Sequence, residues 1–119
     1  MLKESVRAYG KTEENCARII LRSVAEEYDI SLSGDILSSC GGISGGFGIG
    51  GFCSGLVAAV MALGLLFDEM EVKEKRILFL FLVQERLGYL DCCRLSALGP
   101  DCSVVLEEMA DILQEVIQG

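Results

Sequence analysis

The chain has 119 residues, of which 51% are hydrophobic, and its 18 acidic and 10 basic residues give a formal net charge of −8. This length and hydrophobic fraction favour a single folded domain over residues 1–119 and exclude an intrinsically disordered chain. Because a surface this negative repels phosphate backbones, nucleic acid is not an expected partner.

Six cysteines and no histidine limit the chemistry. Without histidine the chain lacks the commonest general base and metal ligand, so a metal would have to be held by thiolates, carboxylates, backbone carbonyls or exogenous atoms. The first ten residues, MLKESVRAYG, contain no apolar segment of the kind found in signal peptides, and we expect a cytoplasmic protein. Cytoplasmic thiols stay reduced unless they are catalytic or metal-bound, so a static disulfide framework is not expected.

The first third of the chain predicts three helices. A short helix is expected over Leu2–Tyr9, ahead of a glycine. Thr12 is suited to cap a second helix over about residues 13–28, with Cys16 on its apolar face. A third, short helix is expected to run from a cap at Ser33 through Ser39, ahead of a glycine pair.

The centre of the chain, residues 41–67, contains no charged residue and organises the rest. A glycine-rich loop leads into a helix over about residues 52–67 that is apolar on every side, with Cys53 at its start. Such a helix must be wrapped by other helices or by lipid. The segment is about long enough to span a bilayer, but its glycine-rich first third and the amphipathic helices around it favour a protein interior, so no membrane span is expected.

The loop also contains GFGIGG, residues 46–51, which fits the spacing G-x-G-x-x-G. That spacing binds dinucleotides when it connects a strand to a helix in a βαβ unit. No strand is predicted before it, so the pattern favours a turn packed under a helix end over a nucleotide site.

The second half of the chain predicts two more long helices. The first covers residues 71–87; its apolar run 77–83 would also suit a strand, but strong helix formers flank it and Gly88 follows it. Residues 89–100 are expected to be a connector that ends in a turn at Gly99-Pro100, and Asp101 is expected to cap the last helix. The fold class is therefore all-α, a compact bundle of about five helices around the central apolar helix.

The positions of the cysteines suggest thiol chemistry. Cys53 and Cys102 are expected at helix N-termini, where the helix dipole lowers the pKa of a thiol, and Cys93 precedes the cation Arg94. The alternative is that the cysteines only fill the core, because a buried cysteine is by default an inert, small hydrophobic residue. No CxxC occurs, the spacing matches no zinc-finger or ferredoxin pattern, and one of the adjacent Cys92 and Cys93 is expected to be structural.

Five segments follow one another in an order that carries a family resemblance: Asn15-Cys16-Ala17, the glycine loop ending in Cys53, Met61-Ala62-Leu63-Gly64, Cys93-Arg94-Leu95 with Gly99, and Cys102. They resemble a family named for its cysteine pattern, C_GCAxxG_C_C, whose redox activity is itself inferred and which is related to the N-terminal part of split-Soret cytochromes. The family's C-G-A-x-x-G motif is here Cys53-Ser54-Gly55-Leu56-Val57-Ala58, which keeps only the cysteine. Cys40 and Cys92 have no counterpart in the pattern.

The resemblance implies a helical fold with Cys16, Cys53, Cys93 and Cys102 as a redox or metal-binding set. We therefore predict a redox-active protein that exchanges thiols and disulfides with a partner protein, or that holds an iron–sulfur cluster or other metal on these four cysteines. Cys53 is expected to be the most reactive thiol, and Cys93 with Cys102 the exchanging pair.

The alternative belongs to another class of function. The protein would be a non-catalytic helical interaction module, or a homodimer, with its cysteines as core residues. Small residues on the central helix and the apolar run at residues 77–83 motivate this alternative.

Overall fold

The computed structural model describes residues 1–99 and 102–119, and these residues confirm the all-α fold class. The described residues form seven α-helices, of which five have eight residues or more: α1 Leu2–Tyr9, α2 Cys16–Glu27, α3 Gly34–Ser39, α4 Ser54–Leu66, α5 Glu69–Leu87, α6 Cys92–Leu95 and α7 Ser103–Gln118. Three short helical turns complete them: η1 Cys40–Gly42, η2 Gly46–Gly50 and η3 Ser96–Leu98. The expected Gly99-Pro100 turn and the Asp101 cap fall on or depend on residues outside the described ones.

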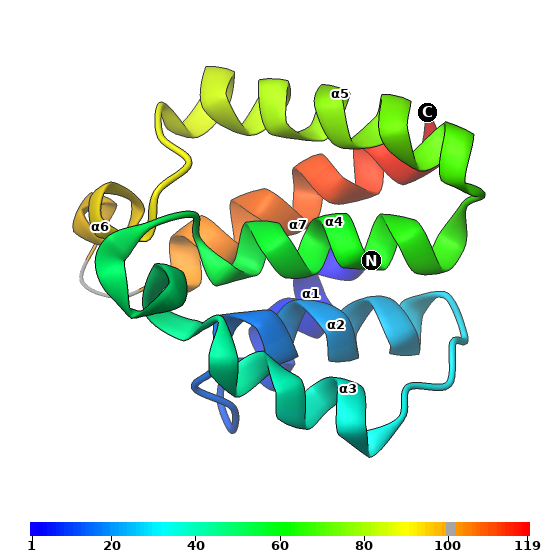
Figure 1. The fold of residues 1–119 in the computed structure, drawn as a ribbon, viewed down its shortest axis with the longest axis horizontal. Helices are drawn as coiled ribbons and strands as arrows, with labels where there is room; N and C mark the ends of the chain where they lie inside the picture. Colours follow the sequence, from blue (N-terminus) through cyan, green and yellow to red (C-terminus); the bar gives the residue numbers. More distant parts are fainter. Residues whose placement is uncertain (100–101) are drawn as a thin grey trace.

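Helix α4 lies in the middle of the bundle, with α2 on one side and α5 and α7 on the other (Figure 1). Its small residues except Gly64 are buried and let neighbouring helices approach closely; a Cβ added at Gly55 would lie 2.9 Å from Leu106 of α7. The expectation that α4 would be covered on every side was wrong, because Met61 and Leu65 are exposed. Among the described residues, no helix combines the length and the hydropathy that crossing a membrane requires.

Capping side chains decide where the helices begin. Ser33 caps α3 as predicted, accepting a hydrogen bond from the backbone of Ile36. Helix α2 begins three residues later than predicted, because Asn15, not Thr12, is its N-cap and accepts from the backbone of Arg18. Helix α5 begins two residues earlier than predicted, because Asp68 caps it. The connector expected before residue 100 contains the short helix α6.

The glycine loop is a compact turn that closes on itself. Gly46, Gly48 and Gly50 all have positive φ, and the backbone N–H of Gly51 donates to the carbonyl of Gly46 at 2.9 Å. A Cβ at Gly46 would lie 2.5 Å from backbone atoms of Gly51, a distance that no side chain tolerates. No βαβ unit is formed by the described residues, so the loop has the packed-turn role that the sequence favoured.

Replacing Gly46 should therefore be costly. We expect G46A to lower the free energy of unfolding by about 2 kcal/mol or more, because it adds a backbone clash to a positive φ. Two matched variants separate these causes: G48A has positive φ and open space and should cost about 1 kcal/mol, whereas G42A has neither problem and should change stability by less than about 1 kcal/mol. Urea denaturation measures the free energy of unfolding of all three variants. Equal losses of stability for G46A and G48A would show that the clash at residue 46 adds no cost.

Candidate functional site

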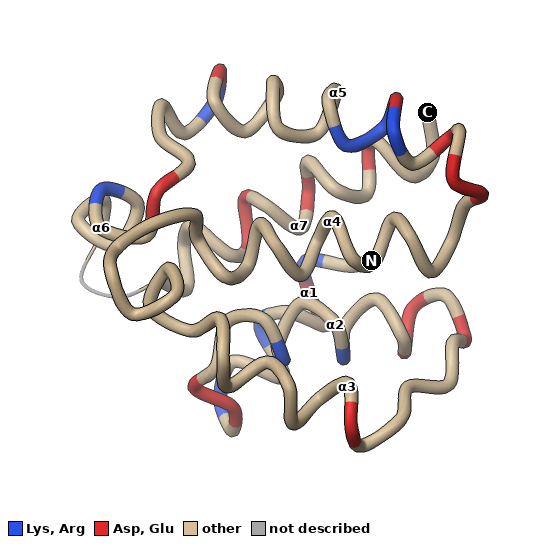
Figure 2. Tube along the Cα trace, in the orientation of Figure 1, with Lys and Arg blue, Asp and Glu red and all other residues tan. Residues whose placement is uncertain are grey.

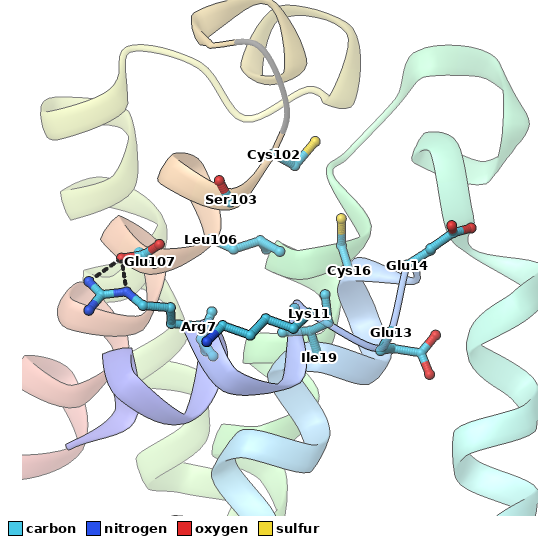
Figure 3. A pocket seen from close by; sticks show the side chains of 12 residues that line it. Arg7, Lys11, Glu13, Glu14, Cys16, Ile19, Cys102, Ser103, Leu106 and Glu107 are labelled. Atoms are coloured by element: carbon cyan, nitrogen blue, oxygen red, sulfur yellow. Dashed lines mark hydrogen bonds and ion pairs between the residues drawn. The ribbon is translucent and has the colours of Figure 1, made fainter.

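Two cysteines line one pocket of about 490 Å³ beside α1. Cys16 is the first residue of α2, and Cys102 is the N-cap of α7. Figure 3 shows the Cys16 sulfur pointing toward the start of α7, where Cys102 lies. Both side chains are half-buried. The structure thus joins two thiols that are far apart in the sequence, at adjoining helix starts and within reach of a ligand in the pocket.

Polar contacts fix the start of α2 and with it Cys16. Asn15 donates from Nδ2 to the carbonyl of Cys40 at 3.2 Å, while its backbone N–H donates to Glu13 at 3.1 Å. Arg18 donates from Nε to the carbonyl of Leu37 at 2.8 Å and pairs with Glu13 at 3.4 Å. The N-terminus of α2 is therefore tied to α3 and to the turn that follows it, so the position of Cys16 is set by side chains on both sides of it.

Two further thiols, those of Cys53 and Cys92, flank a short antiparallel backbone bridge. Phe52 pairs with Asp91 in this bridge; the N–H of Cys53 donates to Leu90 at 3.0 Å, and the N–H of Cys92 donates to Gly51 at 2.7 Å. Cys53 is the N-cap of α4, and Cys92 is the first residue of α6. Four cysteines therefore occupy the N-termini of four helices: Cys16, Cys53, Cys92 and Cys102.

Burial dominates the titration of these thiols. It raises the pKa of Cys16 from an ordinary 9.0 to about 12, and Cys102 adds to the rise through charge repulsion and a hydrogen bond between the two thiols. Cys53 and Cys92 contribute smaller repulsions to the same pKa. Burial also raises the pKa of Cys92, with further increases from Cys102 and Cys93.

The expected lowering of the pKa at Cys53 was wrong. Its thiol does sit at a helix start, and the N–H groups of Leu56 and Gly55 act to lower its pKa. The side chain is only 6% exposed, however, and this burial outweighs the two N–H groups, so the net pKa is raised. A helix N-terminus activates a thiol only where the thiol keeps contact with water.

The remaining two cysteines lie apart from this arrangement. Cys93 is exposed and lies against the glycine loop, where a Cβ added at Gly50 would be 3.7 Å from its sulfur. Cys92, not Cys93, is the member of the adjacent pair that acts on the pKa values of Cys16 and Cys53. Cys40 is buried in η1 and donates from its sulfur to the carbonyl of Ile36 at 3.5 Å. The structure therefore gathers Cys16, Cys53 and Cys102 from the predicted set, with Cys92 as their neighbour.

A signal for Cys92 was present in the sequence. Asp91 accepts a hydrogen bond from the backbone of Arg94 at 2.9 Å and so begins α6 at Cys92. Asn15 begins α2 at Cys16 in the same way. A capping residue directly before a cysteine marks the first position of a helix in both cases. The prediction of a connector over residues 89–100 missed the helix start at Cys92.

A metal site on the thiols would need several of them placed together. Thiolates suit zinc, iron–sulfur clusters and other soft metals. Within residues 1–99 and 102–119, however, no three cysteine or carboxylate side chains are placed to hold a metal ion together. The donor chemistry fits a thiophilic metal but the arrangement does not, and we derive no chemical step through one.

The rest of the pocket is lined by charges of both signs and by apolar side chains. Arg7 and Lys11 bring positive charge, and Arg7 pairs with Glu107 of α7 at 2.6 Å (Figure 3). Glu13 and Glu14 also line the pocket, on the other side from Arg7 (Figure 3). The Arg7–Glu107 ion pair joins α1 to α7 beside the thiols, so a contact between two helices holds this wall of the pocket in place.

Comparison with known proteins gives one match. A family model described as "Putative redox-active protein (C_GCAxxG_C_C)" matches residues 14–116. No curated protein and no solved structure matches the chain. The matched range contains all six cysteines and covers most of the chain.

Proposed function

Because the chain belongs to the C_GCAxxG_C_C family, whose description is that of a putative redox-active protein, we propose that it exchanges thiols and disulfides through Cys16 and Cys102. The observation that carries this proposal is the shared pocket: both thiols line it, and charge repulsion and a hydrogen bond couple them. Exchange requires two thiols that can meet and a path by which a second disulfide reaches one of them. The pocket supports both requirements.

Cys102 begins the exchange. Only a thiolate attacks a disulfide, and the Cys16 thiol, with a pKa of about 12, is protonated at neutral pH. Cys102 first gives up its proton to water, and the resulting thiolate, accepting the hydrogen bond of Cys16, attacks one sulfur of a disulfide on a redox partner protein. The partner's S–S bond breaks, its second sulfur leaves as a thiolate, and a mixed disulfide remains on Cys102.

Cys16 completes the exchange. Its proton passes to the departing thiolate, and its sulfur attacks the Cys102 sulfur of the mixed disulfide. The Cys16–Cys102 bond forms as the bond between Cys102 and the attacked sulfur of the partner breaks, and that sulfur leaves as a thiolate while the partner's second sulfur carries the proton from Cys16. The protein has lost two electrons and two protons, and the partner's disulfide has gained the two electrons. In a cytoplasmic setting the dithiol is the resting form.

Cys53 and Cys92 lie near this pair as neutral thiols. Burial keeps the resolving thiol of Cys16 protonated until the mixed disulfide has formed, and Cys53 and Cys92 would raise the pKa of Cys16 further only if they ionised. Their own raised pKa values keep them in the thiol form at neutral pH. We assign them the role of reduced neighbours and leave the bond-forming steps to Cys16 and Cys102.

The test is oxidation of the reduced full chain with glutathione disulfide, followed by alkylation and mass mapping. We expect the loss of two hydrogen atoms and a peptide pair joined through Cys16 and Cys102. C16S should stop at a glutathione adduct on Cys102, because the resolving thiol is missing. C102S should form neither the adduct nor the bond at the wild-type rate. A bond between any other two cysteines would contradict the assignment.

Two further variants serve as controls. C40S removes a buried thiol outside the pocket and keeps a hydrogen-bond donor for Ile36, so it should behave as the wild type. C93S distinguishes the Cys16–Cys102 pair from the Cys93–Cys102 pair that the sequence suggested; loss of the bond in C93S would favour the latter. Metal content of the same protein, purified without oxygen, tests the metal alternative: near-stoichiometric iron or zinc would replace exchange by metal binding.

A further inference from the structure

Helix α5 lies at the edge of the bundle and leaves one face uncovered (Figure 1). Its inner side buries Phe79 and Val83. Its outer side exposes Ile77 and Phe81, which are 67% and 58% accessible to solvent. Apolar side chains of this size, exposed next to each other, are typical of interaction surfaces. The small residues of α4 that motivated a dimer are buried inside the chain except for Gly64, whereas Ile77, Leu78 and Phe81 of the apolar run of α5 are exposed.

Four exposed residues form one line along this face, each four positions after the last. We define the outer row of α5 as Lys73, Ile77, Phe81 and Glu85. Residues spaced by four lie one above another on a helix, and such rows form the ridges by which helices pack together. The row carries a cation at one end, an anion at the other and two apolar side chains between them. Figure 2 shows the uncharged middle of α5 between charged turns at both ends.

This order of charges is complementary to itself when reversed. We propose that the outer row is the contact of a two-fold symmetric dimer, in which α5 packs antiparallel against α5 of a second copy. The two-fold axis passes at the level of residue 79, so that Lys73 of each copy faces Glu85 of the other, and Ile77 faces Phe81. Each charged side chain of the row thereby faces an opposite charge, and each apolar side chain faces another apolar one. A two-fold interface requires this self-complementarity, because both copies contribute the same surface.

The charged ends of the row are not paired within the part of the chain that the structure describes. Within residues 1–99 and 102–119, neither Lys73 nor Glu85 forms an ion pair. Other cations of α5 are engaged internally: Lys75 lies 4.6 Å from the centre of the Phe67 ring, and Arg86 pairs with Glu115. The dimer would give both ends of the row an opposite charge despite the net charge of −8, which otherwise drives copies apart.

Charge reversal tests this arrangement directly. The full chain, kept reduced so that no intermolecular disulfide forms, is measured by sedimentation equilibrium. We expect a dimer for the wild type and a dissociation constant raised about tenfold by either K73E or E85K, because each reversal places like charges at two symmetric contacts. An equimolar mixture of K73E and E85K should recover the dimer, since every contact then joins opposite charges. The double variant K73E/E85K should recover it as well.

An apolar variant and a matched control complete the experiment. F81E should abolish the dimer, because it places a charge at the centre of the contact. V104E changes an equally exposed apolar residue on α7, 64% accessible, and should leave the dimer intact. Circular dichroism checks that each variant is folded. A monomeric wild type up to about millimolar concentration, or a mixture that fails to recover the dimer, would overturn the proposal. Since the measurement is of mass and not of thiol chemistry, either result leaves the redox proposal as it stands.

Discussion

The reduced protein is expected to lose stability steeply between pH 9 and pH 12, and Cys16 should cause the largest part of the loss. Burial and Cys102 raise the pKa of Cys16 from 9.0 to about 12 in the folded state. A thiol whose pKa is higher when folded stabilises the fold fully below its unfolded pKa, and this contribution falls as pH rises toward the folded value. The difference corresponds to about 4 kcal/mol, a large fraction of the stability of a small domain.

Comparison of the wild type with C16A by urea denaturation isolates this contribution. C16A lacks the packing of the Cys16 side chain at every pH, but it has no thiol to ionise at this position. Between pH 8 and pH 11 the free energy of unfolding of the wild type should therefore fall by about 2–3 kcal/mol more than that of C16A. V24A is the matched control, since Val24 is buried on the same helix and does not titrate. The difference in free energy of unfolding between V24A and the wild type should not change with pH. If the difference in free energy of unfolding between C16A and the wild type is also independent of pH, Cys16 ionises as freely in the folded protein as in the unfolded chain.

Truncation of Phe79 is expected to cost about 3–5 kcal/mol, because its side chain is fully buried and its removal leaves a cavity. Phe79 anchors α5 to the bundle, and α5 carries no other buried side chain as large. Phe81 is on the same helix, but its ring is 58% exposed. We expect F81A to change the stability of the monomer by less than about 0.5 kcal/mol.

This pair of variants is measured by urea denaturation at a protein concentration below that at which any dimer forms. The two substitutions remove the same atoms from the same helix, so the difference between them reports burial alone. Similar losses for F79A and F81A would mean that α5 has a different rotation about its axis from the one described, and would also remove the basis of the outer row.

Much of the fold could be predicted from the sequence, because the signals that set helices are local. Ser33 caps α3 through its own backbone neighbours, and Gly88 ends α5 with a positive φ that glycine adopts without strain. The uncharged segment around α4 predicted the central position of that helix. Errors arose where two capping residues competed: Thr12 and Asn15 both precede the apolar face of α2, and only the contacts of Asn15 with Cys40 and Glu13 decide between them.

By itself the sequence determined that this protein is helical, that it has a single apolar helix at its centre, that Cys53 and Cys102 stand at helix starts, and that the cysteines follow the order of one family. Those properties depend on neighbours along the chain. Only the tertiary structure decided that Cys16 meets Cys102 in a pocket, that Cys92 and not Cys93 stands with them, and that the pKa of Cys53 is raised. The physical reason is that proximity and desolvation depend on residues remote in sequence, and burial at Cys53 outweighs the local effect of its helix.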